Sequence, residues 1–86
     1  MDPKQVEELI RRALPEAHVE VHSEDNTHFG ALLISEAFAG LRPLARHQLV
    51  YGALGERVGR EIHALSIEAY TPQEWSARQQ TGKARG

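Results

Sequence analysis

The sequence contains no cysteine, no long apolar run and only two lysines, and each absence narrows the functions open to it. Without cysteine there is no disulfide, no thiol nucleophile and no complete thiolate metal site. A metal held here would need histidine or carboxylate ligands, or ligands from a partner. No apolar run approaches the roughly 20 residues of a membrane span, and no basic-then-apolar start indicates a signal peptide. We therefore expect a cytoplasmic protein without membrane contact.

The size and charge of the chain favour one small domain. It has 86 residues and a formal net charge of −2, which argues mildly against a large surface that follows phosphates but leaves room for a local basic patch. Residues 1–78 are expected to form the domain. Residues 79–86 have no apolar anchor and are predicted to be a disordered tail.

Two capping boxes predict where helices begin. Asp2-Pro3-Lys4-Gln5 begins the first helix, which Pro15 ends, and Thr71-Pro72-Gln73-Glu74 begins the last. Trp75, on the last helix, is expected to cover the core. The charged side chains of the first helix are expected in solvent: Glu7, Glu8, Arg11 and Arg12.

Alternating apolar and polar residues predict three strands, at 17–22, 29–35 and 62–70. The polar turn at 23–27 joins the first two as a hairpin. The mostly helical segment 36–61 is long enough for a crossover, so the third strand can run parallel to the second. The prediction is an α+β domain of order αββααβα with a three-stranded mixed sheet.

The helical segment before the third strand contains glycines and cations. Gly52, Gly55 and Gly59 predict two helical pieces with a hinge between them. The cations beside the apolar stripe form either a solvated basic face or a docking patch for phosphate or an acidic partner. From these residues alone we favour the solvated face; they are Arg42, Arg46, His47, Arg57 and Arg60.

Histidines suggest a second candidate site. His18 and His22 share a strand face but lie ~13 Å apart, too far for one metal ion, so both are expected in solvent. His28 precedes the second strand and His63 opens the third. Because parallel strands begin at the same end of a sheet, these two histidines should meet there. They would form a half-site for a metal whose other ligands come from elsewhere.

The chain lacks the motifs of an enzyme. It has no cysteine nucleophile, no G-x-S-x-G and no phosphate loop, and its two aspartates, Asp2 and Asp25, are not placed for a triad. We expect a protein that is not an enzyme.

Five ordered stretches, spread over about residues 5 to 76, resemble the BolA family and within it the bacterial IbaG (YrbA) branch. They are Thr27-His28-Phe29, Ser35-Glu36-Ala37-Phe38-Ala39-Gly40, Arg46-His47-Gln48-Leu49-Val50-Tyr51, Ile62-His63-Ala64-Leu65-Ser66-Ile67 and Tyr70-Thr71-Pro72-Gln73-Glu74-Trp75. Each stretch alone is a weak signal, but the ordered set with these spacings is specific.

The resemblance implies a fold similar to the type II KH domain, with the helices on one face of the sheet. It also implies an adaptor that binds a monothiol CGFS glutaredoxin and shares a [2Fe–2S] cluster with it, in iron–sulfur trafficking or sensing. His63 matches the family's histidine ligand, and His28 is the nearest candidate for a second ligand. The isolated chain would hold no cofactor and be a monomer, with at most a weak homodimer.

The alternative that the resemblance offers is a DNA-binding transcriptional regulator of stress or morphology genes. The residues to test would be Arg42, Arg46, His47 and Arg57. Residues 52–55 spell GxxG, the pattern of the nucleic-acid loop of KH domains, but the two middle residues are apolar and lie on the core stripe. We therefore interpret this pattern as a helix break.

Overall fold

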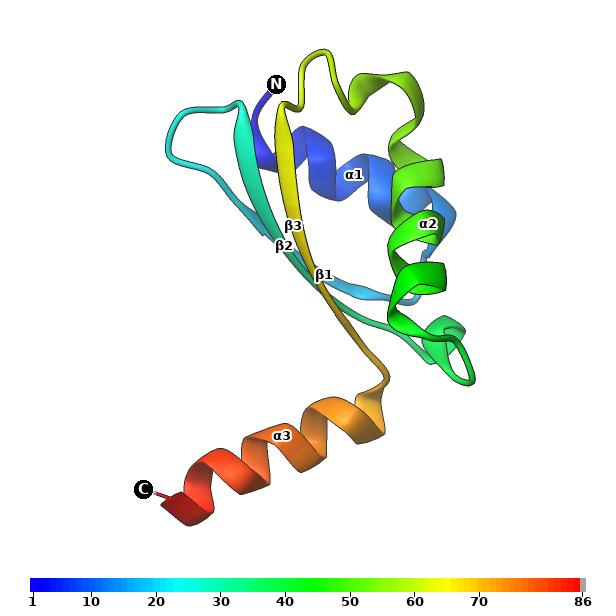
Figure 1. The fold of residues 1–86 in the computed structure, drawn as a ribbon, viewed down its shortest axis with the longest axis vertical. Helices are drawn as coiled ribbons and strands as arrows, with labels where there is room; N and C mark the ends of the chain where they lie inside the picture. Colours follow the sequence, from blue (N-terminus) through cyan, green and yellow to red (C-terminus); the bar gives the residue numbers. More distant parts are fainter. Residues whose placement is uncertain (86) are drawn as a thin grey trace.

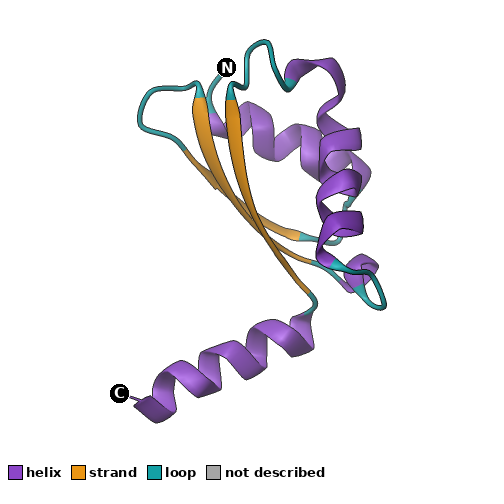
Figure 2. Ribbon diagram, in the orientation of Figure 1, coloured by secondary structure: helices purple, strands orange, loops and turns teal. Residues whose placement is uncertain are grey.

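The computed structural model describes the backbone of residues 1–85 and the side chains of residues 1–79. Figures 1 and 2 show the arrangement of its helices and strands. In chain order the elements are α1 (Pro3–Ala13), β1 (His18–His22), β2 (His28–Ile34), the 3₁₀ turn η1 (Glu36–Phe38), α2 (Pro43–Leu54), the 3₁₀ turn η2 (Gly55–Arg57), β3 (Ala64–Tyr70) and α3 (Pro72–Arg85).

The sheet has the predicted mixed topology, with the strand order β1-β2-β3. β1 pairs antiparallel with β2, and β2 pairs parallel with β3 in a register that sets His28 opposite Ala64. The crossover through α2 makes the parallel pairing possible, because parallel neighbours need a long connection that returns the chain to the same end of the sheet. The prediction of an α+β domain with a three-stranded mixed sheet is confirmed.

One face of the sheet is covered and the other is largely open. Figure 1 shows α1 and α2 on the same side of the strands, and the alternate residues of β1 and β2 that face them are buried. Burying this apolar layer is the main driving force for folding. The completely buried apolar side chains are Val6, Ile10, Leu33, Phe38, Val50, Leu54 and Ile62.

Helix α1 begins at the predicted capping box, in which Asp2 and Gln5 exchange hydrogen bonds of 2.9 Å. The prediction that Glu7 lies in solvent is wrong, since this residue is only 9 % exposed. Its carboxylate accepts a hydrogen bond from the backbone N–H of Val21, and Arg11 donates to the carbonyl of Val19. Glu7 and Arg11 also form an ion pair of 3.5 Å. Both backbone groups belong to the edge strand β1, so the pair occupies polar groups of one edge of the sheet.

The predicted break in the second helical segment lies at Gly55. Its φ of 61° ends α2, and this left-handed backbone conformation favours glycine. The second predicted helical piece is only the single 3₁₀ turn η2. The apolar residues after the break, Val58 and Ile62, instead pair as an isolated bridge that closes the loop before β3.

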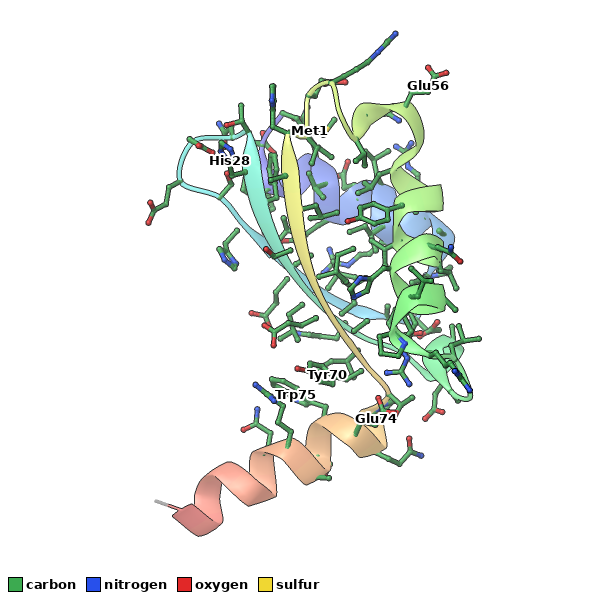
Figure 3. The ribbon with its side chains drawn as sticks, in the orientation of Figure 1. Met1, His28, Glu56, Tyr70, Glu74 and Trp75 are labelled. Atoms are coloured by element: carbon green, nitrogen blue, oxygen red, sulfur yellow. The ribbon has the colours of Figure 1, made fainter. Side chains whose placement is uncertain are left out.

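Helix α3 begins at the predicted capping box of Thr71 and Glu74 but does not join α1 and α2 on their face of the sheet. Trp75 packs on Tyr70 with 5.4 Å between ring centroids, at the end of the open face (Figure 3). The prediction that Trp75 covers the core is therefore wrong, because β3 delivers α3 to the other side. Side chains from residue 80 onward lie outside the described part, and the disordered tail at 79–86 stays a prediction.

None of the helices in the described chain is long and apolar enough to cross a membrane.

Candidate functional site

The starts of the two parallel strands bring His28 and His63 together, as predicted. Their ring centroids lie 6.5 Å apart, with an angle of 41° between the ring planes. Figure 3 shows His28 at the hairpin end of the sheet, and both residues are exposed. The exposure of His63 means that this residue does not serve the core, although it directly follows the buried Ile62.

The hairpin loop holds the His28 ring through Asp25. The ring nitrogen Nδ1 lies 2.7 Å from Asp25 Oδ2, and the backbone N–H groups of Thr27 and His28 donate to Asp25 Oδ1. These hydrogen bonds, above all the one from the backbone N–H of His28, hold the pKa of Asp25 well below its usual range. An ionised carboxylate only accepts hydrogen bonds, so Nδ1–H of His28 donates to Asp25. In the neutral form of the ring, Nε2 keeps a free lone pair.

The backbone, rather than a side chain, fixes the position of His63. The carbonyl of Thr27 accepts hydrogen bonds from the N–H of His63 at 2.8 Å and from the N–H of Ala64 at 3.3 Å. The His63 ring itself has no hydrogen-bond partner among the described residues. The backbone at the start of β3 therefore positions this ring, and its nitrogens are free to bind a ligand.

Two imidazoles supply fewer ligands than a metal ion needs. No group of three or more His, Cys, Asp or Glu side chains in the described part of the chain is placed to hold a metal ion. Neutral imidazole nitrogens are suitable ligands for iron, zinc and copper. An ion or cluster bound at His28 and His63 would thus need further ligands from outside this chain.

A groove of about 700 Å³ runs along the open sheet face beside the histidine pair. Gly30, Ala64 and Ser66 are among its lining residues, together with the carboxylates of Glu24, Asp25 and Glu68. The ring of His22 also borders the groove and packs on Gly30 of β2. A Cβ at position 30 would lie only 2.5 Å from the imidazole Cε1, so glycine leaves the space that this ring occupies.

Only some residues of the predicted basic patch are exposed at the surface. Arg42 and Arg57 are exposed and His47 is half-buried, but Arg46 is only 9 % exposed. Arg46 donates to both carboxylate oxygens of Glu74, at 2.6 and 2.9 Å. Its other bonds go to the backbone carbonyls of Leu41 and Ala69, both at 2.9 Å. The prediction that Arg46 lies on a solvated face is wrong, because almost all its donors are used inside the domain.

The burial of Arg46 is indicated in the sequence by its spacing from apolar residues of the same helix. Arg46 lies four and eight residues before the buried Val50 and Leu54, so it shares their helix face. The only clue to its partner Glu74 is the capping box at the start of α3.

Comparison with known proteins agrees with this fold. The BolA family model, described as BolA-like protein, matches residues 4–74. The chain is 38 % identical over 77 residues to the acid stress protein IbaG of Escherichia coli strain K12, covering 88 % of this chain and 90 % of that protein. A bolA protein homologue from Coxiella burnetii superposes with a TM-score of 0.77 and 36 % identity, over 88 % of this chain and 97 % of that one.

Another relative matches a shorter region. The DNA-binding transcriptional regulator BolA of Vibrio cholerae is 50 % identical over 54 residues, which cover 63 % of this chain and 51 % of the relative. The match thus spans about half the length of that protein. Because the family model and the IbaG match each cover most of this sequence, the chain belongs to the BolA family.

Proposed function

We propose that this protein is a non-enzymatic adaptor that binds a monothiol CGFS glutaredoxin and shares a [2Fe–2S] cluster with it, in iron–sulfur trafficking or sensing. The observation that carries the proposal is the exposed pair of imidazoles, His28 and His63, at one end of the parallel strands. Membership of the BolA family supports it. The pair is accessible to a partner and incomplete without one.

The residues present fit half of a cluster site. A [2Fe–2S] cluster takes four ligands from proteins or small thiols, and this chain offers two imidazoles and no cysteine. The partner and its glutathione would supply thiolates. When bound, the cluster supplies one-electron redox chemistry, and imidazole in place of thiolate raises its reduction potential, as in Rieske centres.

The two histidines have different parts in this proposal. His63 is the main ligand, because its position is fixed by the Thr27 carbonyl while its ring makes no other hydrogen bond. His28 is the second ligand, oriented by Asp25 so that Nε2 can bind a metal. A carboxylate on the far nitrogen is the usual way in which a ligating histidine is held.

A titration with a matched control tests the proposal. Cluster-loaded monothiol glutaredoxin is titrated with this protein and followed by visible circular dichroism. We expect a changed cluster spectrum that saturates at a one-to-one ratio, is lost with His63→Ala and is retained with His18→Ala. His18 is a suitable control because it is exposed on β1 and pairs with Glu20. An unchanged spectrum with no complex would contradict the proposal.

DNA binding is the second candidate. It is supported by the exposure of Arg42 and Arg57 and by the name of the Vibrio cholerae relative, a DNA-binding transcriptional regulator. With Arg46 engaged inside the domain, few cations remain on this surface. DNA affinity that falls steeply with salt, and less steeply in Arg42→Ala, would favour this function; weak binding that ignores sequence would count against it.

A further inference from the structure

The two edges of the sheet are closed to different extents. On β1, Glu7 accepts a hydrogen bond from the outward N–H of Val21 at 3.3 Å, and Arg11 donates to the outward carbonyl of Val19 at 3.2 Å. On β3, Arg46 donates to the carbonyl of Ala69 at 2.9 Å. Among the described residues, the protection of the β3 edge thus lies at the end of the strand that leads into α3.

The hydrogen bonds at the two ends of β3 show which residues face away from β2. The carbonyl of Tyr70 accepts from Ser35 at 2.9 Å, and the N–H of Ala64 donates to Thr27 at 3.3 Å. Backbone groups alternate in direction along a strand of a parallel pair. Positions 64, 66, 68 and 70 therefore bond to β2, and positions 65, 67 and 69 point outward.

Leu65 and Ile67 are the unprotected positions. Within the described part of the chain, no group pairs with the outward N–H or C=O of either residue. Buried backbone groups almost always have a partner, so these groups face solvent. The result is an open strand edge that begins two residues after His63.

We propose that residues 64–67 of β3 accept an extended segment of a protein partner as a fourth strand. Only an extended polypeptide offers N–H and C=O groups in the alternation and spacing that this edge requires. The inference rests on the proposed function, because the partner is the protein that supplies the remaining cluster ligands at His63. Strand addition would fix that partner's position beside the histidine pair.

The side chains of β3 indicate the chemistry of the added segment. On the covered face Leu65 and Ile67 are half-buried, and on the open face Ala64 and Ser66 are exposed. A neighbouring strand aligns its side chains with these two faces. The segment should therefore alternate apolar residues toward the helices with small or polar residues on the other side.

A second copy of this chain fits the edge poorly. Arg46 reaches from α2 to the outward carbonyl of Ala69, and α2 runs alongside β3 (Figure 1). If two copies paired through β3, the two β3 strands would lie only ~4.8 Å apart and each would bring its own α2 to the same place. The axes of two packed helices need a separation of about 8–10 Å, so the two α2 helices would collide. A single extended segment brings no such helix.

Amide hydrogen exchange, read by NMR, tests the proposal on the unmodified chain. In the free protein the Leu65 and Ile67 amides should exchange fast, while Ser66 and Glu68 are protected by β2. With the cluster-loaded glutaredoxin, Leu65 and Ile67 should become protected at least tenfold. If the cluster spectrum changes while these two amides exchange as before, strand addition is overturned and the adaptor function stands. If no complex forms, both proposals fail.

A variant separates the backbone donor from the side chain. Ile67→Pro removes an outward N–H, which an edge strand tolerates, and Ile67→Ala removes side-chain packing but keeps the donor. We expect Ile67→Pro to weaken the complex about tenfold more than Ile67→Ala. Equal affinities of the two variants for the glutaredoxin would overturn the proposal. Protection of the Leu65 and Ile67 amides by a short oligothymidylate, but not by the glutaredoxin, would overturn it as well.

Discussion

The two ends of the parallel strand pair β2–β3 differ in how their polar groups are used. At the end that leads into α3, Arg46 bonds to Glu74 and to the carbonyl of Ala69 inside the domain. At the opposite end, His28 and His63 are exposed, and the ring of His63 has no hydrogen-bond partner among the described residues. We infer that the first end provides stability and the second end provides binding, within one small sheet.

The difference arises from the crossover. α2 begins beside the C-terminal end of β3, so Arg46 in its first turn reaches the carbonyl of Ala69. The capping box of α3 supplies the carboxylate of Glu74. At the opposite end, the hairpin loop around Asp25 and the loop before β3 carry His28 and His63. Loops on a rigid sheet are where binding residues are usually placed.

The largest effect on stability is expected from Arg46→Ala. It leaves two backbone carbonyls without their donor and Glu74 without its cation, and it removes the contact of the guanidinium with Phe38. Loss of a buried hydrogen-bonded partner costs about 1–3 kcal/mol, and Glu74 can regain water because it is half-exposed. We expect the free energy of unfolding in urea to fall by about 2 kcal/mol.

Arg42→Ala is the matched control, because it removes an exposed arginine at the start of the same helix. It should change the free energy of unfolding by less than about 0.5 kcal/mol. Equal losses in the two variants would show that the buried network of Arg46 contributes no more to stability than an exposed arginine.

A smaller effect should depend on pH. The hydrogen bonds from Arg46 and from the backbone N–H of Thr71 lower the pKa of Glu74 from 4.5 to about 2. A carboxyl whose pKa is lower in the folded state stabilises the fold above its unfolded pKa, and this contribution is lost as the pH falls through the folded value. The native protein should thus lose stability as the pH falls from about 4.5 to about 2.

Glu74→Gln cannot lose that contribution, so its unfolding free energy should fall less over the same pH range. Urea unfolding at both ends of the range measures the difference. Asp25, whose pKa is also lowered, remains in the variant and should leave part of the acid sensitivity. An identical pH dependence in the two proteins would show that the Arg46–Glu74 pair does not act as described.

The smallest effect on stability is expected from the histidines. His63→Ala and His28→Ala remove exposed rings, so each should change the free energy of unfolding by less than about 0.5 kcal/mol. Both should nevertheless alter the cluster spectrum with the glutaredoxin, His63→Ala more strongly. Thermal or urea unfolding beside the spectral titration checks both statements, and a large loss of stability in His63→Ala would mean that this residue serves the fold.

The sequence predicted the fold and the meeting of the histidines because both follow from local patterns. Capping boxes, alternation and the length of the crossover fix the element order and the parallel pairing. Parallel pairing then places His28 and His63 at one end without any motif that joins them.

The sequence did not predict contacts made over long distances along the chain. Arg46 is 23 residues from Ala69 and 28 from Glu74, so its burial depends on tertiary packing. Glu7 lies 14 residues from Val21 and was expected in solvent for the same reason. The position of Trp75 also differs, because the direction in which α3 leaves β3 is not encoded in its capping box.

The most direct test of the account is the electron paramagnetic resonance of the reduced, shared cluster, with ¹⁵N-labelled histidine in this protein only. We predict nitrogen hyperfine coupling from directly bound imidazoles, which loses the contribution of one nitrogen in His63→Ala and is unchanged in His18→Ala. A shared cluster that shows no coupling to the labelled nitrogen would contradict the assignment of His63 as a ligand.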